Sequence, residues 1–174
     1  MNYTIDELYA NHADSVYQYI FLLVRKKEVA EDLTQETFIK VFRNLHQFND
    51  EARVTTWIIQ IAKNTTYDYF RKTKWTHLFS EKHDVNSSIT PSTEQTVINK
   101  TSVQELYDAL KTLKREYQEV VILRKINQLT IKETAIVLGW TENKVKAKLA
   151  RALKKLQAEM LKQEVLLDGK TKRA

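Results

Sequence analysis

Apolar residues recur every three or four positions through most of the first seventy residues, which is the spacing of one buried face of an α-helix. This pattern predicts helices over residues 4–25, 29–45 and 57–72, with the polar stretch 46–54 as a loop. A capping box at Thr4, in which a hydroxyl and a glutamate satisfy free backbone amides, is expected to start the first helix. Three helices of this kind can share one core.

The pattern is lost over residues 73–100, where Ser, Thr, Asn and acidic residues dominate and the only proline, Pro91, occurs. Such a composition is typical of a flexible linker. The helical pattern resumes with a capping box at Thr101 and predicts helices over 106–113 and 117–123. The expected organisation is a first helical domain, a linker, a second helical domain and a frayed tail, at residues 1–72, 73–100, 101–160 and 161–174.

A third capping box begins at Thr130 and opens a short helix that Gly139 is expected to end. Thr141 is placed to cap a last helix, so the turn between the two helices is short and they must cross. A short helix, a glycine turn and a basic helix together predict a helix-turn-helix. The buried stripe of the last helix is expected to consist of Val145, Leu149, Ala152, Leu153 and Leu156.

The composition agrees with an all-α fold of two small helical domains. Apolar residues make up 43% of the chain, enough for real cores, whereas two glycines and one proline are too few for a turn-rich β protein. The absence of cysteine excludes disulfides and cysteine-based zinc sites. Neither a signal peptide nor a bilayer-spanning run is visible, so we expect a cytoplasmic protein that does not insert into a membrane.

The formal net charge of +6 and the pI of about 9.3 favour a polyanionic partner. No acid interrupts the basic residues of the last helix. Three of them, Lys144, Lys148 and Arg151, lie three or four apart and share an exposed ridge that suits a major groove about 12 Å wide. A basic face is also found on ordinary solvated helices and on helices at membrane surfaces. The capping box, the glycine turn and the single sign of charge favour DNA. The full set of basic residues that this helix presents is Lys144, Lys146, Lys148, Arg151, Lys154 and Lys155.

Three blocks of the first half point to a family. They are EDLTQETF at 31–38, TWIIQIAKN at 56–64 and DYFRK at 68–72. In this order, followed by a linker and a helix-turn-helix, they strongly resemble the extracytoplasmic-function (ECF) sigma factors, small promoter-specificity subunits of bacterial RNA polymerase. The resemblance covers roughly residues 5–158. It implies a protein that directs core polymerase to a set of promoters, in an envelope or stress response, without catalysis or a cofactor of its own.

The resemblance implies that the EDLTQETF helix docks on a coiled coil of the polymerase's largest subunit. The spacing alone places three of its polar side chains on one helical face, where they can touch one partner together. An acidic cluster near a helix N-terminus can also do no more than complement the helix dipole. The residues assigned to polymerase binding are Asp32, Gln35, Glu36 and Lys40.

By motif position, the resemblance assigns the minus-ten promoter element to the loop and the third helix. Phe48, stranded in a polar loop, is either an anchor for a small core or a platform for an unstacked base. Asn64 offers a donor and an acceptor, which suits the edge of an exposed base. The full set is Phe48, Asn49, Asp50, Arg53, Asn64, Asp68, Arg71 and Lys72.

The same resemblance assigns the minus-thirty-five element to the helix-turn-helix. Ala147, Ala150 and Leu153 depart from the residues that many relatives carry, so the promoter sequence stays open. The residues assigned to this element are Arg124, Thr141, Lys144, Lys146, Lys148 and Arg151.

Two other classes of protein fit the sequence less well. An enzyme finds no support, because there is no glycine-rich phosphate loop and the four histidines lack metal-ligand spacing: His12, His46, His77 and His83. A helix-turn-helix repressor or activator would bind duplex DNA by itself, normally as a dimer. The family also implies an anti-sigma protein, often bound to the membrane, although no residue here points to one by itself.

Overall fold

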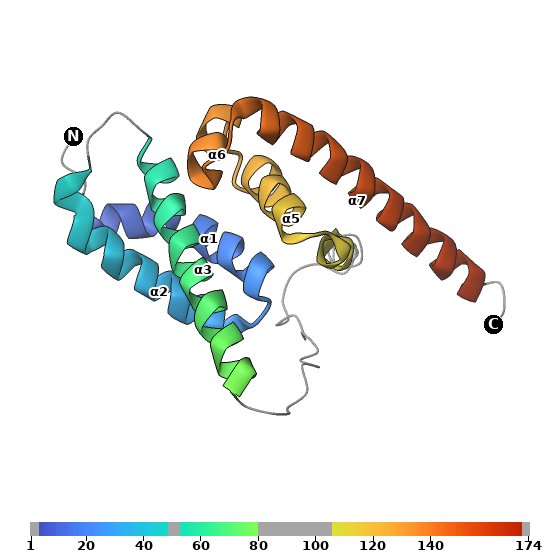
Figure 1. The fold of residues 1–174 in the computed structure, drawn as a ribbon, viewed down its shortest axis with the longest axis horizontal. Helices are drawn as coiled ribbons and strands as arrows, with labels where there is room; N and C mark the ends of the chain where they lie inside the picture. The colour runs from blue at the N-terminus through green and yellow to red at the C-terminus, as the bar shows by residue number, and fades with distance from the viewer. Residues whose placement is uncertain (1–3, 49–52, 80–105, 172–174) are drawn as a thin grey trace.

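The computed structural model describes residues 4–48, 53–79 and 106–171, and within these ranges the chain is helical with no strand. Figure 1 shows that the first half of the chain forms a three-helix unit. A short 3₁₀ turn, η1, ends the second helix. The elements are α1 (Ile5–Val24), α2 (Lys27–Asn44), η1 (Leu45–Gln47) and α3 (Val54–Phe79).

The second half is described from residue 106 onward and is helical from 106 to 112. Its next helix turns into a π-helical segment, η2, and the helix-turn-helix follows. The elements are α5 (Arg115–Val121), η2 (Ile122–Ile126), α6 (Ile131–Leu138) and α7 (Glu142–Thr171). The predicted capping box at Thr101 lies outside the described residues.

The predicted helices are confirmed in kind, but two ends were predicted wrongly. We expected the third helix to end near Lys72, whereas α3 continues to Phe79 because no glycine or proline interrupts it. The Thr73 hydroxyl donates to the Tyr69 carbonyl, 2.6 Å away, and so fits the helix. Likewise α7 continues to Thr171, through a stretch we expected to be frayed that is rich in Leu, Lys, Glu and Gln.

The two halves pack against each other. Their buried apolar residues form one continuous cluster, which includes Tyr19, Ile20 and Ile58 from the first half and Ile122 and Leu123 from the second. Helix α3 lies against α6, and α1 lies against η2. Burial of each large aliphatic side chain contributes roughly 1.5–3 kcal/mol, so this shared core holds the halves together as well as each half by itself.

None of the helices in the described ranges combines the length and the apolarity that crossing a bilayer requires.

Candidate nucleic-acid interface

The turn between α6 and α7 has the geometry of a helix-turn-helix, as predicted. The backbone amide of Glu133 donates to Thr130 Oγ1 (3.2 Å), and Glu133 Oε2 accepts from the Thr130 amide (2.7 Å). Gly139 ends α6 at φ +66°, a left-handed conformation that favours glycine. The Lys144 amide donates to Thr141 Oγ1 (3.2 Å), so α7 starts directly after the turn.

Most of the predicted basic ridge is exposed, but Lys148 is not free. Lys144, Lys146 and Arg151 are exposed on α7. Lys148 is half-buried, forms an ion pair with Glu116 and lies 5.2 Å from the centre of the Tyr117 ring. Its hydrogen bond lowers the pKa of the Glu116 carboxyl. The sequence showed no acid among these basic residues, but Glu116 of α5 lies beside them. Lys148 must therefore break its ion pair with Glu116 before it can reach a phosphate.

Two other residues assigned to the minus-thirty-five element also have structural engagements. The Thr141 hydroxyl is the N-terminal cap of α7. Arg124 lies in η2, half-buried, and its Nε is buried without a hydrogen-bond partner among the described residues. A buried unpaired donor is costly, so a partner that reaches Arg124 would relieve that cost.

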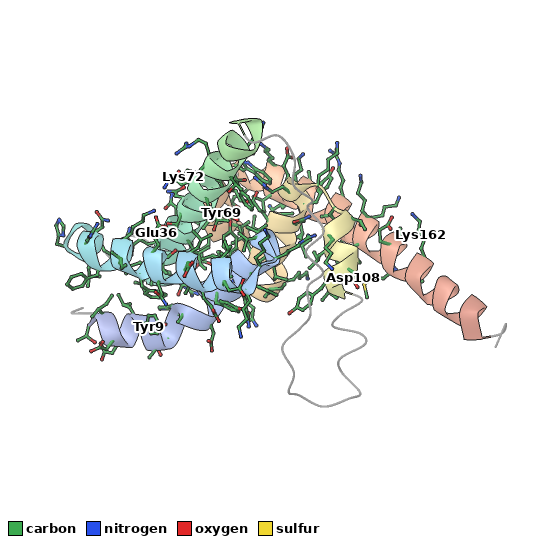
Figure 2. The ribbon with its side chains drawn as sticks, turned by 90° about the horizontal axis from the view of Figure 1, so that it is seen from below. Tyr9, Glu36, Tyr69, Lys72, Asp108 and Lys162 are labelled. Carbon is green, nitrogen blue, oxygen red and sulfur yellow. The ribbon has the colours of Figure 1, made fainter. Side chains whose placement is uncertain are left out.

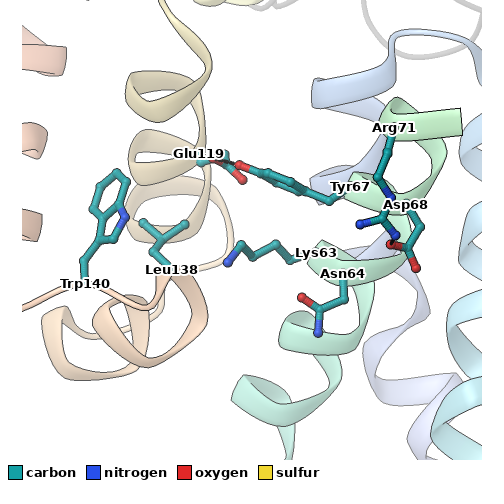
Figure 3. A pocket seen from close by; sticks show the side chains of 8 residues that line it. All are labelled: Lys63, Asn64, Tyr67, Asp68, Arg71, Glu119, Leu138 and Trp140. Atoms are coloured by element: carbon teal, nitrogen blue, oxygen red, sulfur yellow. Dashed lines mark hydrogen bonds and ion pairs between the residues drawn. The ribbon is translucent and has the colours of Figure 1, made fainter. Parts of the chain in front are cut away.

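The exposed face of α3 borders a cleft of about 370 Å³ between the two halves. Figure 3 shows Asn64, Asp68 and Arg71 on the α3 side of this cleft and Trp140 of the helix-turn-helix on its other side, with Lys63 and Tyr67 reaching across from α3. Asn64 is exposed, while Asp68 Oδ1 accepts from Arg71 Nη2 at 2.7 Å. Lys72 is exposed one residue further along. The predicted strand-reading residues therefore share one helix face.

The surroundings of Phe48 are compatible with both alternatives that the sequence left open, an anchor for a small core and a platform for an unstacked base. Its ring lies 5.0 Å from that of Trp57, tilted by 38°, and both side chains are half-buried. Trp57 in turn packs on the core. Arg53 Nε lies 3.5 Å from Glu133 Oε1 of α6. The assigned residues Asn49 and Asp50 lie outside the described residues.

The polar residues assigned to the polymerase lie on the outer side of α2. Asp32 and Gln35 are exposed, and Glu36 Oε1 pairs with Lys40 Nζ at 2.7 Å. Lys40 Nζ also donates to Thr65 Oγ1 of α3 (3.1 Å), so Lys40 faces its own core more than a partner. Figure 2 shows Glu36 and Tyr9 at the α1–α2 end of the molecule, with Lys162 of α7 on the other side.

The sequence analysis did not predict that two apolar residues are exposed on the outer side of α2. Phe42, one of the apolar residues in the pattern that predicted the helix over 29–45, is 62% exposed, and Ile39 is 50% exposed. Ile39 lies two positions from the buried Thr37, about 200° round the helix, so a helical wheel would have shown it among the polar residues. We call Asp32, Gln35, Glu36, Ile39 and Phe42 the α2 face.

A buried acid between the halves was also missed. Glu119 of α5 is only 1% exposed, and its carboxylate accepts hydrogen bonds from Tyr19 (3.2 Å) and Tyr67 (2.8 Å). Burial raises the pKa of Glu119, while the two hydroxyl hydrogen bonds act in the opposite direction. Burial also raises the pKa of both tyrosines. The position of Glu119 in the sequence gave no sign that its side chain is buried, because its two tyrosine partners are far away along the chain.

Within the described part of the chain, no cluster of three or more His, Asp or Glu side chains is arranged to hold a metal ion.

Comparison with known proteins gives matches over both halves. The family model for sigma-70 region 2 matches residues 8–76, and that for sigma-70 region 4 matches residues 103–156. The chain is 31% identical to the ECF RNA polymerase sigma factor SigX of Bacillus subtilis, over 97% of this chain and 90% of that protein. It is 30% identical to SigM of the same organism, over 89% and 94% respectively.

Among solved structures, the fold is similar to that of the sigma factor RpoE from Bartonella quintana, determined in complex with the anti-sigma factor NepR. The TM-score is 0.78 with 23% identity, over 90% of this chain and 96% of that chain.

Proposed function

The chain belongs to the ECF sigma factors, and we propose that it directs core RNA polymerase to its promoters by holding the enzyme with α2, the minus-ten element with α3 and the minus-thirty-five element with α7. The observation that carries this proposal is the 31% identity to SigX over nearly the whole of both chains. Members of this family act in transcription initiation, so we assign the chemistry of RNA synthesis to the polymerase. We propose that it acts in the cytoplasm, where its partners, polymerase and promoter DNA, are found.

The decisive experiment is transcription in vitro from genomic DNA with purified core polymerase, followed by sequencing of the transcript starts. We expect starts that share paired upstream elements and that depend on adding this chain. A chain that neither binds core polymerase nor changes the starts would contradict the proposal. Specific binding of duplex DNA by a dimer of the chain alone would favour a repressor or activator instead.

Polymerase docking is assigned to the α2 face, where an apolar centre lies among polar residues. Ile39 and Phe42 supply exposed apolar area, and Asp32, Gln35 and Glu36 surround it. An apolar centre with a polar rim is the usual composition of a protein interface. This arrangement supports docking over the alternative that the acidic residues only complement the helix dipole.

Recognition of the minus-ten element is assigned to the Phe48–Trp57 pair and the exposed α3 face. We expect Phe48→Ala to reduce promoter opening by roughly fivefold to a hundredfold, because a base stacked on an aromatic ring gains about 1–3 kcal/mol. Opening is measured by permanganate reactivity of unpaired thymines, and polymerase affinity is measured alongside. Loss of polymerase binding in place of opening would mean that Phe48 only anchors the fold against Trp57.

Recognition of the minus-thirty-five element is assigned to the exposed ridge of α7. Arg151 is exposed, so Arg151→Ala should lower the slope of log affinity against log salt by about 0.9, the value for one lost phosphate contact. Lys162→Ala is the matched control, because Lys162 lies further along α7 and pairs with Glu159 at 2.8 Å. Equal slopes for the wild type and Arg151→Ala would show that this side chain does not reach the backbone of DNA.

We also propose that an anti-sigma protein controls this chain in an envelope or stress response. The support is that RpoE of Bartonella quintana, which has a similar fold, was determined in complex with an anti-sigma factor. The exposed apolar residues of the α2 face offer a surface that such a protein would have to cover.

A further inference from the structure

Among the described residues, polar contacts join the two halves at several places, one of which is the Arg53–Glu133 pair given above. Asn127 Nδ2 of the second half donates to Ser15 Oγ (2.7 Å) and to the Ser15 carbonyl (2.9 Å). Lys63 Nζ of α3 donates to the Val137 carbonyl of α6 (2.9 Å). The Arg115 guanidinium lies 3.8 Å from the centre of the Phe70 ring. A further contact is made by Glu119, described above.

Glu119 differs from the other contacts because its side chain is buried and both of its hydrogen bonds come from the opposite half. Tyr19 of α1 donates to one carboxylate oxygen. Tyr67 of α3, whose side chain reaches Glu119 in Figure 3, donates to the other. A buried carboxylate is costly unless it is hydrogen-bonded. The closed arrangement therefore depends on both hydroxyls, whereas an open one would return the carboxylate to water without that need.

The closed arrangement is incompatible with holding both promoter elements. The two elements lie about 25 base pairs apart, which is about 85 Å along a duplex at about 3.4 Å per base pair. Here Lys63, the neighbour of Asn64 on α3, touches α6 of the helix-turn-helix. One duplex cannot place both elements within one cleft, so the halves must separate before both are bound.

We propose that Glu119, Tyr19 and Tyr67 form a latch that holds the free chain closed and that opens when the chain binds polymerase and promoter DNA. The effect of the latch on activity rests on the proposed function, because the closed form is inactive only if the chain must hold two separated promoter elements. When a partner binds only the open form, its apparent affinity for the chain is the intrinsic affinity multiplied by the fraction of chains that are open. The latch thus sets how readily the free chain enters the polymerase.

The latch can be tested without polymerase, because the natural chain has no cysteine and two introduced thiols can carry a fluorescent pair. Glu28→Cys on α2 and Gln157→Cys on α7 are both exposed sites, one in each half. Energy transfer between the labels is followed through a urea titration, so that the opening midpoint is measured even where the closed form dominates in buffer. Circular dichroism over the same titration shows whether the halves separate before or together with the unfolding of their helices, and in either case the midpoint of the energy transfer reports the stability of the closed form.

In this background Tyr67→Phe should lower the ratio of closed to open chains about tenfold and shift the opening midpoint to lower urea, because a hydrogen bond to the carboxylate is lost. Tyr69→Phe makes the same chemical change on the same helix, where the hydroxyl has no hydrogen bond to any described residue, and should leave the midpoint unchanged. Equal midpoints for the two variants would overturn the latch.

The functional consequence is tested by locking the halves together. Asn127 Nδ2 lies 2.7 Å from Ser15 Oγ across the interface, so Ser15→Cys with Asn127→Cys is the pair chosen for a disulfide, and its formation is checked by the loss of free thiols. Oxidation of this pair should reduce transcription at least tenfold, and reduction should restore it, while Ser15→Cys alone should not respond. Full activity of the oxidised pair would overturn the proposal. A wild-type chain that fails in the same assay would count against the proposed function, and the urea titration would still decide the latch.

Discussion

Replacing Ile39 with glutamate is expected to weaken binding of core RNA polymerase by about thirtyfold to a thousandfold, the effect of losing a central anchor worth about 2–4 kcal/mol. Ile39 lies on the side of α2 opposite to the buried stripe and is 50% exposed, so the free chain tolerates the change. Its neighbours Gln35 and Phe42 lie one turn to either side. In a docked complex the new carboxylate would be dehydrated next to Glu36, which adds repulsion to the lost apolar area.

The measurement is equilibrium binding of labelled chain to core polymerase, with circular dichroism to establish that the variant is folded. Leu161→Glu is the matched control, because Leu161 is 54% exposed and lies on α7 away from the α2 face. Docking through α2 predicts a large loss for Ile39→Glu and little change for the control. Equal affinities for both variants would move polymerase docking off the α2 face.

The sequence was sufficient for the features that depend on neighbours along the chain. The capping boxes at Thr4 and Thr130, the left-handed Gly139 and the cap at Thr141 are all local, and each was found at its predicted position. The periodic stripe of α7 was predicted for the same reason: Val145, Ala152 and Leu156 are buried, while Leu149 and Leu153 are partly buried against the core. The family resemblance, carried by contiguous blocks, was confirmed by comparison over both halves.

What the sequence did not predict depends on residues that are far apart in the chain. Lys148 and Glu116 pair across two helices, and Glu119 meets Tyr19 over a separation of 100 residues. Neither contact follows from helical spacing. The length of α3 was missed because polar residues after Lys72 resemble a linker, although the helix needs only the absence of a breaker there. The packing of the two halves likewise appears only once both cores are built.

The second large effect is expected at Ile58, at the centre of the packing of α3. Its side chain is fully buried, and α3 contacts α1, α2 and α6. Ile58→Ala should lower the free energy of unfolding by about 2–5 kcal/mol, from lost burial and from the cavity that remains. The matched control is Ile136→Ala, the same change at a side chain that is 43% exposed, which should cost less than about 1 kcal/mol.

Two tryptophans make this substitution a test of how the halves are coupled. Trp57 reports on the first half and Trp140 on the second, so chains that keep one of them and replace the others with phenylalanine follow each half through a urea titration. Because the buried residues form one cluster, Ile58→Ala should shift both transitions together, although it lies in the first half. If only the Trp57 transition moved, the halves would fold independently and the closed arrangement would contribute little stability. A joint shift would mean that the contacts that keep the free chain closed also stabilise its fold, so that the polymerase and DNA must supply the free energy of separating the halves.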